Sequence, residues 1–233
     1  MNKWIMAGTA AAFTGAAAFA RSEYERTHLD VVHYDIKTDK LGLEWNGFKA
    51  VFLSDLHDNS FGMENEELIA AIEKEQPDIV LIGGDMLVVK EWAAPHFDML
   101  ANLYEKLVER YPVYYAFGNH EQRMKEEPLT YSGWWQSYWK VLKDSGMHVL
   151  VNKSEEIIKN GTAMRISGIT LPRECYRKGR IPSLSAGYLD QKLGKACLHT
   201  HQPLQRHMPI GVPIWYLVVI FMEVPLESLV LAV

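Results

Sequence analysis

The sequence predicts an α/β protein built around a largely parallel sheet. Apolar runs of strand length alternate with amphipathic segments of helix length, and three of these runs end abruptly in polar residues. Such alternation favours parallel strands with helices on the faces of the sheet. The chain has 233 residues, 48% apolar and 23% charged, which is the composition of a globular protein. This length allows one large domain or two small ones.

The strands follow in a regular order. Segment 22–36 predicts a polar exit and then an alternating strand, with Leu29, Val31 and Tyr34 on its buried side. The continuous apolar run 48–54 is typical of a strand covered on both faces. Further strands are expected at 78–85, 112–121 and 147–152, and a hairpin at 155–169 turns at Asn160-Gly161, a strong turn signal.

Helices are expected between these strands. Segment 64–76 carries apolar residues at helical spacing and is closed by Pro77. Segments 95–111 and 133–146 are amphipathic, and Gly146 suits the C-cap of the second. The first two-thirds of the chain therefore read strand, helix, strand, helix, strand, helix, strand.

The first 21 residues favour a membrane anchor or a signal segment. An Ala-rich apolar stretch runs from Trp4 to Ala20, between Lys3 and Arg21. Its length is marginal for a spanning helix, which needs roughly 17–25 residues, and its cationic start and small residues also fit a cleaved signal peptide. Membrane association is therefore expected, in an orientation that the charges do not fix.

Net charge and cysteine usage disfavour several other classes of protein. The formal charge of −5 and the lack of a basic stripe argue against nucleic acid as a partner. Cys175 and Cys197 are far from any CxxC arrangement, so neither a disulfide framework nor a thiolate metal site is indicated.

Polar clusters at three strand ends predict a shared site. Asp55 and His57 follow the first buried strand, Asp85 the second, and Asn119 and His120 the third. The carboxyl ends of parallel strands line one edge of a sheet, where ligands bind. Carboxylate, imidazole and amide oxygen together suit a divalent cation. Each residue alone would more often be a turn or cap residue, but three clusters together favour a metal site.

These motifs resemble those of the calcineurin-like metallophosphoesterases. "DLH" at 55–57, "GGD" at 83–85 and "GNHE" at 118–121 stand in the family's order and spacing, and the similarity covers roughly residues 45–195. The N-terminal segment is similar to that of bacterial membrane-associated members. The resemblance implies a four-layer αββα sandwich and a dinuclear centre of two divalent metal ions, with manganese, iron and zinc all compatible.

The resemblance also implies a role for each site residue. Asp55 and His57 would bind the first metal, Asp85 would bridge both, and Asn119 would bind the second. His120 would be the catalytic residue, as general acid or as a group that stabilises the transition state. The metals would activate a water molecule to attack phosphorus and neutralise charge on the phosphoryl oxygens. The expected partner is a phosphomonoester or phosphodiester substrate.

The last 38 residues depart from the family pattern. The family's later "GHxH" is absent, and His201 in "THQP" is at best a partial match for its preceding histidine. Read in a shifted frame, the codons from Ile210 onward permit "WGADLVLGGHLHGGTVRIPGFSG". We therefore expect a frameshift near residues 195–198, arising from a sequencing error or a genuine lesion. The nucleotide sequence tests this, because its shifted frame must encode "GHxH" there.

The expected organisation is an N-terminal segment 1–21, a metallophosphoesterase domain 22–195 and an aberrant tail 196–233. The tail contains Pro203, Pro209, Pro213 and Pro225, which disfavour interior strands. The second half of the sandwich would then be incomplete and hydrolysis crippled. The predicted function is a metal-dependent phosphoesterase. The alternative is a catalytically inactive, membrane-tethered binding protein that retains the fold.

Overall fold

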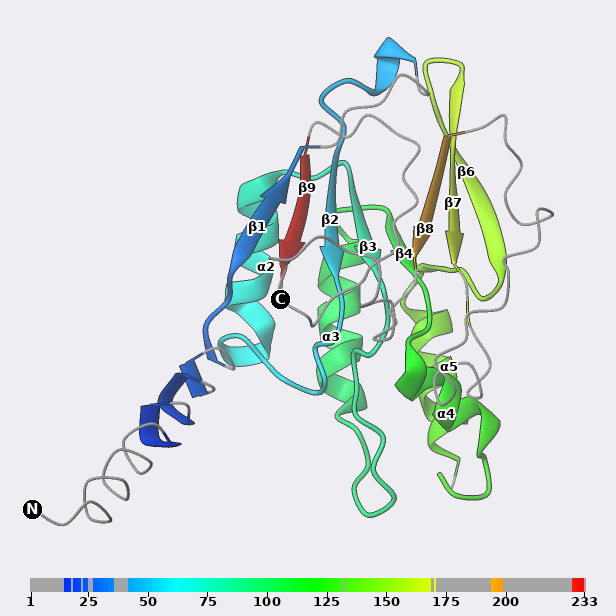
Figure 1. The fold of residues 1–233 in the computed structure, drawn as a ribbon. Helices are drawn as coiled ribbons and strands as arrows, with labels where there is room; N and C mark the ends of the chain where they lie inside the picture. The colour runs from blue at the N-terminus through cyan, green and yellow to red at the C-terminus, as the bar shows by residue number, and fades with distance from the viewer. Residues whose placement is uncertain are drawn as a thin grey trace, which may run out of the picture.

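The computed structural model describes residues 15–17, 19–21, 23–24, 27–35, 42–131, 133–168, 170, 194–198 and 228–232. Within them a six-stranded sheet lies beside a three-stranded sheet, with helices behind the larger one (Figure 1). The predicted α/β class is confirmed.

Four parallel strands form the centre of the larger sheet. They are β2 (Lys49–Leu53), β3 (Ile79–Ile82), β4 (Val113–Tyr115) and β5 (His148–Val149), side by side in chain order. On the other side of β2 lies β9 (Ser228–Ala232), also parallel, and β1 (Val31–Tyr34) closes that edge as an antiparallel strand. This is the largely parallel sheet that the alternating pattern predicts.

In the part of the chain that the structure describes from residue 42 onward, four α-helices accompany this sheet. Three match the predicted segments: α2 (Glu66–Glu75), α3 (Phe97–Val108) and α5 (Trp134–Asp144). Gly146, one residue past the C-cap Ser145, has φ 79°, a left-handed conformation that glycine adopts readily after a helix. Two short 3-10 turns, Leu43–Trp45 and Met63–Asn65, precede β2 and α2.

Helix α4 (Asn119–Glu126) was missed by the sequence analysis, which extends a strand over 112–121. The sequence of α4, NHEQRMKE, has too few apolar residues to show a helical period. The strand β4 ends at Tyr115, and the chain turns at Gly118 directly into the helix. Asn119 and His120 therefore lie in the first turn of a helix and not at the tip of a strand.

The smaller sheet is a hairpin joined by a third strand. Strands β6 (Lys153–Lys159) and β7 (Thr162–Gly168) pair antiparallel through the predicted Asn160-Gly161 turn, whose φ values of 51° and 84° suit a two-residue hairpin loop. Strand β8 (Gly194–Leu198) pairs parallel with β7.

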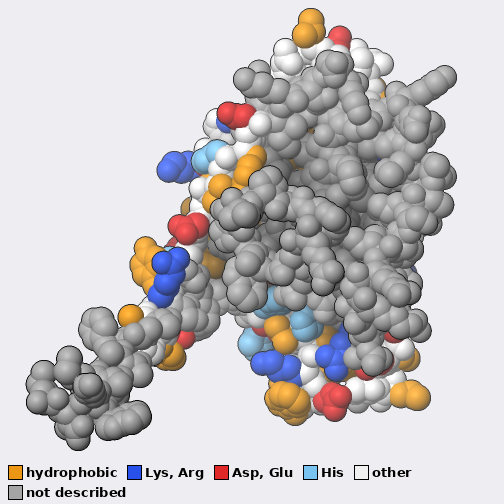
Figure 2. Space-filling model, in the orientation of Figure 1, with side chains coloured by type: hydrophobic (Ala, Val, Ile, Leu, Met, Phe, Trp, Pro, Cys, Tyr) orange, Lys and Arg blue, Asp and Glu red, His pale blue; other side chains and the backbone are white. Residues whose placement is uncertain are grey.

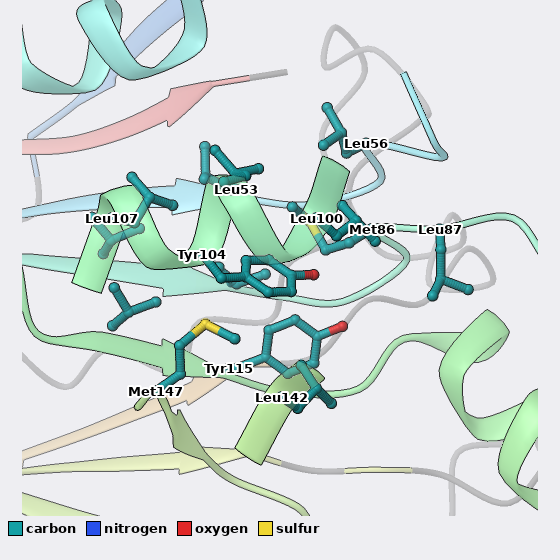
Figure 3. Packing of buried hydrophobic residues seen from close by; sticks show 14 of the residues in the cluster. Leu53, Leu56, Met86, Leu87, Leu100, Tyr104, Leu107, Tyr115, Leu142 and Met147 are labelled. Carbon is teal, nitrogen blue, oxygen red and sulfur yellow. The ribbon is translucent and has the colours of Figure 1, made fainter. Parts of the chain in front are cut away.

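Two apolar clusters hold three layers together. Alternate residues of β2–β4, including Val51, Ile82 and Tyr115, pack against the helices in the first cluster (Figure 3). The intervening residues, including Phe52 and Leu81, pack against the smaller sheet in the second. Both faces of the central strands are therefore buried, which explains their continuous apolar runs. These layers correspond to three of the four in the expected sandwich.

Two expectations about strands were wrong. Tyr34 is 43% exposed, because the alternation that turns Val31 inward turns Tyr34 outward. The tail was expected to add no interior strand, yet β9 lies between β1 and β2. The four tail prolines lie outside the described residues.

The N-terminal prediction is not tested by this structure. Residues 1–14 lie outside the described part of the chain, and 15–17 and 19–21 are helical and exposed. Among the described residues, none of the helices combines the length and the apolar character needed to cross a bilayer.

Candidate metal centre

Three loops meet at the carboxyl edge of β2, β3 and β4. Asp55 donates its backbone N–H to the carbonyl of Gly84 (3.0 Å), and His57 donates its own to the carbonyl of Asp85 (3.1 Å). The Asn119 side-chain amide donates to Oδ2 of Asp85 (2.8 Å). The structure therefore brings all the predicted site residues to one place. Figure 2 shows histidine side chains gathered in the lower part of the visible face.

The potential ligand atoms of this cluster are close enough to share a cation. One ligand atom from each of His57, Asp85 and His120 lies within 4.8 Å of the others. Nε2 of His57 is 3.7 Å from Oδ1 of Asp55, and the rings of His57 and His120 are 5.3 Å apart between centroids. Oxygen and imidazole donors at this spacing fit a divalent metal ion. How the residues divide between metal binding and catalysis stays a prediction.

The backbone of these loops adopts a conformation that most residues avoid. Asp55, His57, Asp58 and Asp85 all have φ between 52° and 59°, in the left-handed region. Non-glycine residues there carry strain of about 1 kcal/mol or more each. Strain of this kind concentrates at functional sites because the surrounding structure must hold it in place.

The Asp85 carboxylate is placed where its negative charge is unfavourable. The residue is 2% exposed. Burial, with the nearby charges of Glu121 and Asp55, raises its pKa well above the usual value. Burial also raises the pKa of Asp55, against the hydrogen bond from Ser54 and the charge of His57. A divalent cation would relieve this crowding, so the electrostatics as well as the donor types fit a metal ion.

A hydrogen bond to one ring nitrogen fixes the orientation of the His120 side chain. The backbone N–H of Val89 donates to its Nδ1 over 3.1 Å, and its own backbone N–H donates to Oδ1 of Asp85 (2.8 Å). Burial, with the charges of His57 and Arg123, lowers its pKa to about 4. Because Nδ1 accepts a hydrogen bond, the neutral ring carries its proton on Nε2.

Two functional side chains were not singled out by the sequence analysis. Glu121 is fully buried and accepts hydrogen bonds from two of the site loops. Its place three residues after the N-cap Gly118 is a helix-start signal that could have found it. Asp58 accepts the backbone N–H of Val88 (2.9 Å) and of His96 (3.3 Å). Nothing in the sequence indicates that long-range role.

Comparison with known proteins points to one family. The family model described as "Calcineurin-like phosphoesterase" matches residues 48–212. The chain is 29% identical over 151 residues to "Uncharacterized metallophosphoesterase YkoQ" of Bacillus subtilis (strain 168), covering 65% of this chain and 52% of that protein. It is 29% identical over 113 residues to "Phosphodiesterase YaeI" of Escherichia coli (strain K12), covering 47% and 38%. The chain thus spans about half the length, or less, of these curated relatives.

Proposed function

Because the chain belongs to the calcineurin-like phosphoesterase family, we propose that it is a metal-dependent hydrolase of a phosphomonoester or phosphodiester. The observation that carries this proposal is the convergence of His57, Asp85 and His120, with ligand atoms within 4.8 Å of one another. Of the two relatives, one is named a metallophosphoesterase and the other a phosphodiesterase, which supports the same class of reaction.

In this proposal four side chains hold a dinuclear centre. Asp55 and His57 would bind the first ion and Asn119 the second, and Asp85, which contacts both other loops, would be shared by the two ions. Bound divalent ions, manganese, iron or zinc, would polarise the phosphoryl oxygen and make a water molecule nucleophilic. The Asp85 side chain is buried and that of Asp55 is 20% exposed, so the protein covers one side of the site.

His120 is proposed to stabilise the transition state through a hydrogen bond from its Nε2–H. The Val89 N–H occupies Nδ1 and leaves the Nε2–H available to donate. Its ring lies 5.3 Å from that of His57 between centroids, close to the proposed metal-binding side chains. A hydrogen-bond donor aimed at the charge that develops in the transition state typically contributes about 10²- to 10³-fold to a rate.

The tail determines how active the chain is. Because "GHxH" is absent from the sequence, we propose that the chain holds part of the metal shell and hydrolyses slowly. A chain with the shifted frame restored from about residue 197 would complete that shell. We therefore expect higher manganese affinity and faster hydrolysis of bis(p-nitrophenyl) phosphate in the restored chain. Its activity should be lost in His120→Ala and Asp85→Ala.

The absent motif also favours a second candidate, an inactive binding protein that retains the fold. Ligand binding without metal by both chains, together with no hydrolysis by the restored chain, would support this second candidate. Metal-dependent turnover by the restored chain would exclude it.

We also propose that residues 1–21 attach the protein to a membrane, supported by their apolar sequence between Lys3 and Arg21. Fractionation of cells expressing the full chain and a chain without residues 2–21 tests this. Equal distribution of both chains between the membrane and aqueous fractions would contradict it.

A further inference from the structure

The buried carboxylate of Glu121 joins two loops of the metal centre. Its Oε2 accepts the backbone N–H of Asp85 (2.9 Å) and of Gly118 (3.0 Å). Its Oε1 accepts the backbone N–H of Met86 (3.1 Å) and the hydroxyl of Tyr115 (2.8 Å). A carboxylate accepts about four hydrogen bonds, so these four donors use its full capacity. One side chain therefore sets the distance between the loop after β3 and the turn into α4.

Three buried tyrosine hydroxyls extend this arrangement into the helix layer. The hydroxyl of Tyr138 lies 2.7 Å from that of Tyr115 and 2.8 Å from that of Tyr104. Figure 3 shows the hydroxyls of Tyr104 and Tyr115 pointing the same way within the apolar cluster. The three residues come from α3, α5 and β4, so the chain of hydroxyls connects these elements to α4.

The direction of these hydrogen bonds follows from counting protons. A carboxylate accepts hydrogen bonds and donates none, so the Tyr115 hydroxyl donates its single proton to Glu121. The Tyr138 hydroxyl must then donate to Tyr115, and the Tyr104 hydroxyl to Tyr138. Successive donation polarises each O–H bond in the same sense, toward the carboxylate.

We propose that Glu121 is a positioning residue for the metal centre and that the directed hydroxyl chain from Tyr104 through Tyr138 and Tyr115 holds its carboxylate in place. The proposal deepens the proposed function and, in its metal-binding consequence, rests on it. Asp85 has φ 52°, a conformation that the surrounding structure must stabilise. Glu121 does so directly, because it accepts a hydrogen bond from the Asp85 N–H. The same carboxylate accepts a hydrogen bond from the backbone N–H of Gly118, next to Asn119.

A series of single-hydroxyl deletions tests the hydrogen-bond chain without any metal. Tyr115→Phe, Tyr138→Phe and Tyr104→Phe each remove one oxygen from a fully buried ring. Hydrogen exchange of the full-length chain in EDTA should rise about tenfold in segments 83–90 and 116–121 for Tyr115→Phe. It should rise less for Tyr138→Phe and less than about twofold for Tyr104→Phe. Equal exchange in all three variants would overturn the directed chain.

A substitution of Glu121 itself tests the consequence for metal binding. Glu121→Gln keeps the size of the side chain but turns an amide NH₂ toward two donors. We expect Mn²⁺ to bind at least about tenfold more weakly, because residues that support ligands typically contribute that much, and the absorption spectrum of bound Co²⁺ to change. The control is Ile72→Val, a core substitution in α2 that leaves every hydrogen-bonding group of the network in place.

The outcomes separate positioning from plain stability. If Ile72→Val shows the Mn²⁺ affinity and Co²⁺ spectrum of the original chain while Glu121→Gln does not, Glu121 positions the site. If both variants, compared at equal loss of thermal stability, weaken Mn²⁺ equally, the positioning role is refuted. Should the unaltered chain bind no Mn²⁺, the proposed function fails, and the exchange series still decides whether the directed hydroxyl chain exists.

Discussion

The backbone N–H of Val89 lies 3.1 Å from Nδ1 of His120 and donates a hydrogen bond to it. Val89 is 2% exposed, so water does not readily replace a lost acceptor there. The contact ties the imidazole to the loop after β3 and assigns the proton of the neutral ring to Nε2. It also allows the structural and chemical roles of His120 to be separated by substitution.

His120→Asn and His120→Ala should differ in stability but not in activity. The asparagine Oδ1 can still accept the Val89 N–H, whereas alanine leaves that buried donor unpaired, which costs about 1–3 kcal/mol. Neither variant retains a hydrogen-bond donor at the Nε2 position, so both should lose about 10²- to 10³-fold in hydrolysis by the frame-restored chain. Urea unfolding and a phosphodiesterase assay measure the two effects. Equal stabilities would show that the Val89 contact contributes nothing.

The pH dependence of stability should reveal His120 in the metal-free protein. Its pKa is about 4 when folded and near 6.5 when unfolded. Between these values the unfolded chain binds a proton that the folded chain does not. The contribution of the neutral ring is therefore complete above pH 6.5 and is lost as the pH falls toward 4.

The comparison that isolates this effect is with His120→Asn, which does not titrate. Urea unfolding in EDTA at pH 7 and pH 5 should show the unaltered chain losing more stability than the variant. Asp55, Asp85 and Glu121 have raised pKa values and therefore add stability as the pH falls. Their contributions are common to both proteins and cancel when the two losses of stability are subtracted. An identical pH response in the two proteins would contradict the lowered pKa.

Asp85→Asn should stabilise the metal-free protein while abolishing metal binding. The substitution removes a buried charge whose pKa is raised by burial and by Glu121 and Asp55. The amide oxygen at position 85 can still accept the His120 N–H. Its NH₂ group can donate to the Asn119 side-chain oxygen once the Asn119 amide rotates by half a turn, so few hydrogen bonds are lost. We expect a gain of about 1 kcal/mol at pH 7.

The gain from Asp85→Asn should shrink as the pH falls. A carboxyl with a raised folded pKa takes up its proton in the folded state first, so the unaltered chain recovers stability in acid and the variant does not. Thermal unfolding in EDTA at pH 7 and pH 5, with Mn²⁺ titration in parallel, checks both parts. A variant less stable than the unaltered chain at pH 7 would show that charge crowding is not what limits this site.

Gly84→Ala should be far more damaging than Gly161→Ala. Both glycines have left-handed φ values, 95° and 84°, so both substitutions carry the same backbone strain. A Cβ at Gly84 would lie 1.9 Å from the backbone nitrogen of Gly118, whereas one at Gly161 would meet nothing within 4 Å. Gly161→Ala should cost about 1 kcal/mol, and Gly84→Ala several times more, with loss of Mn²⁺ binding.

The comparison of these two glycines tests the close approach of the site loops. Unfolding by urea gives the stability of each variant, and Mn²⁺ titration gives the state of the site. Similar losses in both variants would mean that the loops can separate without consequence. The hairpin turn is the matched control because it shares the strained φ but lies away from the metal centre.

Periodicity and turn chemistry were sufficient for the elements whose pattern is local. Helix α2 and the hairpin at Asn160-Gly161 are examples, because one apolar face or one turn specifies them. Helix α4 was missed since its polar sequence has no apolar face. Strand β9 was missed because strand pairing depends on partners that are distant along the chain.

The sequence by itself determined that Asp55, His57, Asp85, Asn119 and His120 would meet at one sheet edge, because parallel strands bring their carboxyl ends together. Only the tertiary structure decided what holds them there. Glu121, the buried tyrosines and the Val89 contact are hydrogen-bonding partners up to 36 residues apart. Such pairs leave no periodic trace in a sequence, since their geometry exists only once the layers have packed.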